Sequence, residues 1–63
     1  MREVDDEKAV AAYTGKSAKT FQNMRWKGEG PAYVKLGASV RYRKVDVDRW
    51  IEENTVRPSG TAA

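Results

Sequence analysis

Hydrophobic residues recur at helical spacing near the start of the chain. Ala9, Val10 and Tyr13 would lie on one side of a short helix, which follows an acidic run at residues 5–7 and ends at Gly15. An aspartate of this run can accept a hydrogen bond from an N–H group of the first turn and so cap the helix. Acidic side chains there also suit the positive end of the helix dipole.

A second helix is predicted from Ser17 to Lys27. The Ser17 hydroxyl can cap its first turn, and Gly28 ends it. The connection between the two helices has only about three or four residues and contains a glycine. Two short helices joined in this way are typical of a helix-turn-helix.

The pattern changes from helical to alternating after Pro31. Residues 33–36 and 40–43 alternate between polar and apolar side chains, which predicts two strands joined by a three-residue loop at 37–39. A lone hairpin is unstable in water, so its apolar face should pack against the helices. The expected inward residues are Val34, Leu36, Val40 and Tyr42, and the expected outward residues are Lys35, Arg41 and Arg43.

A third helix is predicted from about Asp46 to Asn54, with an apolar stripe at i, i+3 and i+4. The domain then spans residues 1–54, and the tail at 55–63, rich in small and polar residues, is expected to be disordered. The fold class is mostly α with a small β-hairpin. The residues expected in the core are Tyr13, Phe21, Val34, Leu36, Val40, Tyr42, Trp50 and Ile51.

Composition excludes several classes of function. The chain has 63 residues, no cysteine and no histidine, so disulfides, thiolate metal sites and a histidine-activated nucleophile are absent. It has no apolar run long enough to cross a membrane, and its acidic N-terminus does not resemble a signal peptide. We therefore expect a soluble intracellular binding module that is no enzyme and uses no metal or cofactor.

The charges are segregated along the chain. Residues 16–44 hold eight basic residues and one acidic residue, a sum of +7, whereas the segments on either side each sum to −2. A basic centre between acidic flanks is typical of a surface that meets a polyanion.

The order of the predicted elements indicates how the residues of the basic centre would be arranged in space. A helix-turn-helix followed by a hairpin is the plan of a winged helix, whose second helix enters the major groove of DNA. Amide and guanidinium groups suit base edges, and lysines suit phosphates. The predicted DNA contacts in the second helix are Ser17, Lys19, Thr20, Gln22, Asn23, Arg25 and Lys27. Those in the wing are Lys35, Ser39, Arg41 and Arg43.

The sequence resembles the small winged-helix DNA-binding proteins of the excisionase and AlpA type, within the MerR-like group. The resemblance covers about residues 4–53 and rests on Tyr13-x-Gly15-x-Ser17, Thr20-Phe21, Asn23, Arg25, Gly28-Glu29-Gly30-Pro31, Lys35-Leu36-Gly37, Val40-Arg41-Tyr42-Arg43 and Asp46-Val47 with Trp50-Ile51. It implies a phage or mobile-element protein in the cytoplasm of a bacterial host, at the nucleoid. Such a protein binds tandem sites, bends DNA and helps a tyrosine integrase to excise the element. Because one copy of a domain this small should bind weakly, we also expect neighbouring copies to associate cooperatively on DNA.

Three departures from the family pattern leave alternatives open. Met24 stands where the family often has Trp, and Trp26 stands where it has a small or polar residue, so Trp26 either closes the core under the wing or anchors another protein. The wing tip is neutral. Val45 replaces the usual cap of the third helix, so either Asp46 caps it or its start is weak. The alternative functions are a transcriptional regulator of the same fold and a protein-interaction adaptor.

Overall fold

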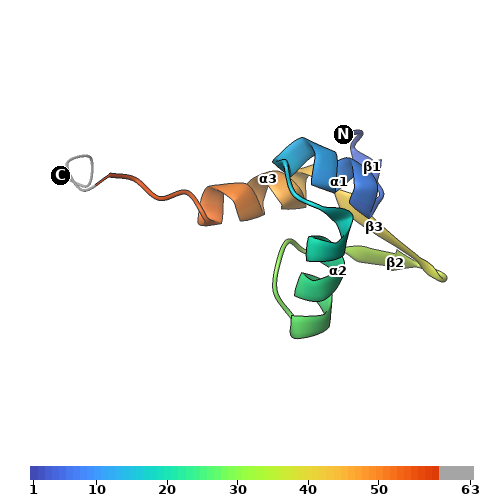
Figure 1. Cartoon of the computed structure of the whole chain (residues 1–63). Coiled ribbons are helices and arrows are strands. Elements are labelled where there is room, and N and C mark those ends of the chain that lie inside the picture. The colour runs from blue at the N-terminus through green and yellow to red at the C-terminus, as the bar shows by residue number, and fades with distance from the viewer. Residues whose placement is uncertain (59–63) are drawn as a thin grey trace.

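The computed structural model describes residues 1–58 of the chain. Three helices and a small antiparallel sheet form a winged helix-turn-helix (Figure 1), as the sequence predicts. The elements in chain order are β1 (Val4–Asp5), α1 (Glu7–Thr14), α2 (Ala18–Lys27), β2 (Val34–Leu36), β3 (Ser39–Arg43) and α3 (Lys44–Glu53). Of the predicted tail, residues 55–58 are exposed and lack regular structure, and residues 59–63 lie outside the described part.

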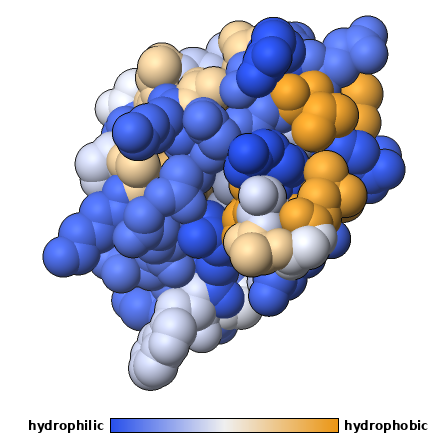
Figure 2. All heavy atoms as spheres, turned by 90° about the vertical axis from the view of Figure 1, so that its right-hand side faces the viewer, coloured by the Kyte–Doolittle hydropathy of each residue, from blue (hydrophilic) through white to orange (hydrophobic). Residues whose placement is uncertain are grey.

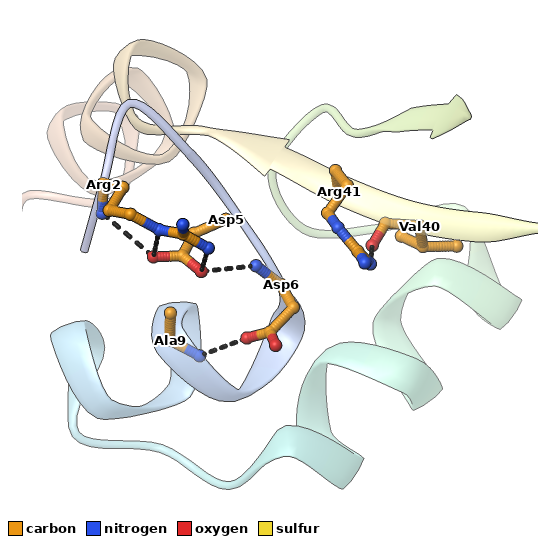
Figure 3. Close-up of polar contacts among 6 residues, drawn as sticks. All are labelled: Arg2, Asp5, Asp6, Ala9, Val40 and Arg41. Atoms are coloured by element: carbon orange, nitrogen blue, oxygen red, sulfur yellow. Dashed lines mark hydrogen bonds and ion pairs between the residues drawn. The ribbon is translucent and has the colours of Figure 1, made fainter.

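Local hydrogen bonds explain where α1 and α2 begin and end. The Asp6 carboxylate accepts a hydrogen bond from the backbone N–H of Ala9 at 2.9 Å (Figure 3), and the Ser17 hydroxyl accepts one from the backbone N–H of Thr20 at 3.2 Å. Both helices end at a glycine with a left-handed backbone, which residues with a side chain rarely adopt. The predicted helix-turn-helix boundaries are therefore confirmed.

The sheet has one strand more than the sequence predicts. β1 pairs antiparallel with β3, so that Val4 lies opposite Arg43 and Asp5 opposite Tyr42, and the strand order is β1-β3-β2. The backbone N–H of Lys44 also donates to the carbonyl of Glu3 at 2.8 Å. The N-terminal segment thereby holds the foot of the wing, at the point where β3 passes into α3.

The register of the hairpin differs from the prediction. Leu36 pairs with Ser39, so the loop has two residues rather than three. Residues paired across an antiparallel sheet share a face, and a shift of one residue moves the side chains of a strand to the opposite face. Val34 and Leu36 therefore lie on the face of Arg41, whereas Lys35 shares the face of Val40 and Tyr42.

This register overturns part of the predicted wing core. Leu36 is 60% exposed and Val34 only half-buried, whereas Tyr42 is fully buried. Figure 2 shows the side of the molecule that carries the wing tip, where hydrophobic residues come to the surface along one edge of a largely hydrophilic face. The predicted burial is thus right for Tyr42, partly right for Val40 and wrong for Leu36.

The third helix begins earlier than the sequence predicts, at Lys44. Its first turn has no side-chain cap, and Asp46 is not the capping residue. The Asp46 carboxylate instead accepts a hydrogen bond from Arg43 Nε at 2.6 Å, and Arg49 lies 3.8 Å away. A buried carboxylate in the first helical turn, paired with two cations, stabilises the helix start in place of a cap.

The core is centred on Phe21, which points from α2 to both the wing and α3. Its ring meets Tyr42 edge-on at 6.1 Å and Trp50 at 5.8 Å between centroids. The buried hydrophobic residues are Val10, Ala11, Phe21, Tyr42 and Val47. The predicted core positions Tyr13 and Ile51 are exposed, and the Tyr13 hydroxyl donates a hydrogen bond to Asp48 at 2.6 Å.

Candidate nucleic-acid interface

Helix α2 is divided between an inner and an outer face. Ala18, Phe21, Met24 and Arg25 are buried or half-buried. The exposed residues of the helix recur at i, i+3, i+4, i+7 and i+8, so they share one face. This outer face consists of Lys19, Gln22, Asn23, Trp26 and Lys27. It carries two cations and no acidic residue, and it holds four of the residues predicted to contact DNA.

The Arg25 guanidinium is directed inward. Its Nη1 donates to the Tyr42 hydroxyl at 2.9 Å and lies 2.9 Å from a Glu7 carboxylate oxygen, and its Cζ lies 5.8 Å from the centroid of the Tyr33 ring. The side chain is only 19% exposed. Burial alone would lower the pKa of Arg25, but the hydrogen bonds with Tyr42 and Glu7 outweigh it and raise the pKa. Arg25 thus joins α1, α2 and β3.

Glu7 is a partner that the sequence does not reveal. Besides Arg25, it accepts a hydrogen bond from the Gln22 amide, so two predicted base-reading residues share one carboxylate of α1. The sequence signal, an acidic residue in the first turn of a helix, indicates only a favourable interaction with the dipole. Of the three residues predicted to read bases, Asn23 alone has no side-chain partner within residues 1–58.

Ser17 and Thr20 form the capped start of α2. The Ser17 Oγ lies 2.9 Å from the Thr20 Oγ1, and it also accepts from the Thr20 backbone N–H. These bonds fix the first turn at the edge of the outer face. Direct contact of either hydroxyl with DNA stays a prediction.

The predicted wing contacts are placed unequally. Lys35 and Ser39 are exposed near the tip. Arg41 is half-buried and its Nη1 donates to the carbonyl of Val40 at 2.8 Å, so the guanidinium lies beside its own strand (Figure 3). Arg43 stands at the foot of the wing, paired with Asp46.

Comparison with known proteins identifies the family of this chain. A family model described as a helix-turn-helix domain matches residues 7–55. The chain belongs to this helix-turn-helix family. The family comprises small DNA-binding proteins of the AlpA and excisionase type, which confirms the predicted resemblance at the level of the family. A search of curated proteins finds no match to the chain.

A helix-turn-helix domain indicates DNA binding, and seven of the eight cations in the basic centre of this one fall into two groups, while Arg41 is half-buried and bonds to a backbone carbonyl. In the basic centre, Arg25, Arg43 and Lys44 pair with carboxylates at 2.6 to 3.0 Å. Four lysines of the same segment form no ion pair within residues 1–58 and are exposed, namely Lys16, Lys19, Lys27 and Lys35. Free charge is therefore concentrated on α2, on the turn before it and on one side of the wing.

The acidic flanks of this helix-turn-helix domain serve its structure. Asp5 accepts hydrogen bonds from the Arg2 side chain and from the backbone N–H groups of Arg2 and Asp6, which lower the pKa of its carboxyl (Figure 3). The Tyr13 hydroxyl and the Lys44 ammonium lower the pKa of Asp48. Residues 1–58 contain no group of three potential metal ligands and no helix that could span a membrane.

Proposed function

We propose that this protein binds double-stranded DNA as an excisionase-type architectural factor, with α2 in the major groove and the wing on the flanking backbone. The observation that carries the proposal is the outer face of α2, which combines exposed lysines and amides with no acidic residue. Such a face suits phosphates and base edges together. The role requires binding and bending of DNA rather than catalysis.

The geometry indicates different roles for the predicted DNA contacts. Asn23 is exposed and unpaired within residues 1–58, so it is the first candidate for reading a base edge, with Gln22 beside it. Lys19, Lys27 and Lys35 would bind phosphates. A base contact by Arg25 would break its bonds with Tyr42 and Glu7, so we assign Arg25 to positioning α2 against the wing.

A domain of this size needs help to bind tightly. Single modules bury roughly 600–1,000 Å² of protein surface on DNA. Neighbouring copies on tandem sites, or a tyrosine integrase bound nearby, would add the missing affinity. Small bends in the duplex would add up if the sites recur in phase with the DNA helix. The setting would be the cytoplasm of a bacterium that carries a phage or mobile element.

A binding titration at several salt concentrations tests the DNA-binding part of the proposal. With about four phosphates contacted by lysines, the slope of log K against log salt should be about −4. A flat response would refute DNA binding and favour a protein-interaction adaptor.

Footprinting across attachment-site and promoter DNA tests the excisionase part. We expect protection of tandem, same-direction sites beside the attachment core, with cooperative filling in gel shifts and progressive bending in circular-permutation assays. Independent filling of promoter sites without a change in DNA curvature would instead identify a transcriptional regulator.

A further inference from the structure

Trp26 is 90% exposed and lies in the last turn of α2, on the outer face of the helix. It lies three residues after Asn23 and seven after Lys19, so these three side chains form one stripe along the helix. This placement excludes the reading in which Trp26 closes the core under the wing. The second tryptophan, Trp50, is half-buried against Phe21 and has the structural role.

The chain after α2 folds back over the inner face and leaves Trp26 uncovered. A Cβ added at Gly30 would lie 3.1 Å from the Cβ of Met24, so the Gly28–Pro31 segment passes close beside the inner side of the helix. Pro31 is buried there. A tryptophan can bury 150–250 Å² of surface, so its almost complete exposure on a short helix indicates that something else covers it.

The charges around Trp26 indicate which kind of partner would contact this stripe of side chains. Lys19 and Lys27 flank Trp26 on the outer face, form no ion pair within residues 1–58, and leave the face without an acidic residue. DNA offers both required chemistries, phosphates for the lysines and apolar groups for the indole. Those apolar groups are thymine C5-methyl groups in the major groove and deoxyribose at its rim.

We propose that Trp26 is a DNA-contact residue, whose indole packs on apolar groups of the duplex between the phosphate contacts of Lys19 and Lys27. The proposal rests on the proposed DNA binding and adds a contact that is independent of charge. Burying even part of the indole would strengthen binding about tenfold or more.

Fluorescence measures the contact directly. In the Trp50→Phe variant, Trp26 is the only indole, and the probe is a single-site duplex selected by the wild-type protein from a random library. On binding, the emission should shift to the blue and become protected from acrylamide. The matched control, Trp26→Phe, keeps only Trp50 and should change little. An emission that stays unchanged while anisotropy shows saturation would overturn the proposal.

The salt dependence of DNA binding distinguishes the contact of the indole from the contacts of the neighbouring lysines. This experiment leaves Trp50 unchanged. Trp26→Ala should weaken binding to the single-site duplex about tenfold at every salt concentration and leave the salt slope unchanged. Lys27→Ala should lower the slope by about one. Unchanged affinity of Trp26→Ala on one site, with lost cooperativity on two, would make Trp26 a contact between proteins and overturn the proposal.

Substituted DNA identifies the group that is contacted. Replacing thymine by deoxyuridine removes only the C5-methyl group. If Trp26 packs on a methyl, this replacement weakens the wild type but not Trp26→Ala; if it packs on deoxyribose, Trp26→Ala still loses affinity and the replacement has no effect. Failure of the wild type to bind any duplex would overturn the proposed function itself, which distinguishes it from failure of this assignment alone.

Discussion

Helix α2 and the wing hold comparable sets of predicted DNA contacts but use their side chains differently. On the outer face of α2, the lysines and Asn23 are exposed and have no side-chain partner within residues 1–58. In the wing, both arginines are engaged, since Arg41 bonds to its own strand and Arg43 pairs with Asp46, and only Lys35 and Ser39 near the tip are exposed without such partners within residues 1–58. Arg25 also belongs to α2 but pairs with Tyr42 and Glu7, so one helix contains both free side chains and side chains that hold elements together. Charge along a sequence therefore overstates the surface that is free for a polyanion, because part of it holds elements together.

The largest effect should come from removing the residue that joins the two regions. Arg25→Ala should lower the free energy of unfolding by about 1–3 kcal/mol, because the Tyr42 hydroxyl and the Glu7 carboxylate lose a charged partner. Urea melts measure this change. The matched control, Asn23→Ala, should leave stability unchanged and weaken binding to the specific site. Unchanged stability of Arg25→Ala with loss of specific binding only would return Arg25 to base reading and weaken the comparison.

A pair of equal charge changes compares the two regions directly. Lys27→Ala should reduce the slope of log K against log salt by about one, whereas Arg43→Ala should change it much less, since Arg43 is paired with Asp46. Both variants lose one positive charge, so a nonspecific effect of net charge would be the same in each. Equal changes in slope would show that the foot of the wing also contacts phosphates.

The smallest expected effect is on the stability of the fold at acidic pH. The pKa of Asp5 is lowered in the folded state by hydrogen bonds from Arg2 and Asp6, so the ionised carboxylate stabilises the fold. This contribution is complete above the unfolded pKa, near 4, and is lost as pH falls further. The melting temperature of the wild type should therefore approach that of Asp5→Asn below about pH 4. A constant gap between the two from pH 7 to pH 2 would show that Asp5 does not stabilise the foot of the wing through its charge.

Elements with local signals are predictable from this sequence. Ser17 and Gly28 bound α2 as expected, because a capping hydroxyl and a left-handed glycine act on the nearest backbone groups. β1 has only two residues and no period to detect, so it is found only through its partner strand. The wing register depends on whether Ser39 belongs to the loop or the strand, and that one residue decides the faces of Val34 and Leu36.

The sequence predicts which helix carries the candidate site, but not which of its side chains are free to contact DNA. Residue types select Arg25 and Gln22 as base readers, yet their side-chain partner Glu7 lies in another helix, 18 and 15 residues away in the sequence. Trp26 is the opposite case. Its size suggests a core residue, but α2 is oriented with Phe21 facing the core, and this orientation leaves Trp26 exposed to solvent. Contacts between distant elements decide both outcomes.

The direct passage from β3 into α3 determines where the chain can change in length. Arg43 is the last strand residue and Lys44 the first helical one, so no connector absorbs an extra residue. One insertion after Lys44 would rotate the rest of α3 by about 100° and carry the buried Val47 out of the core. Insertions and deletions among homologues should therefore avoid this junction and collect just after Asn54, because residues 55–58 are exposed and lack regular structure.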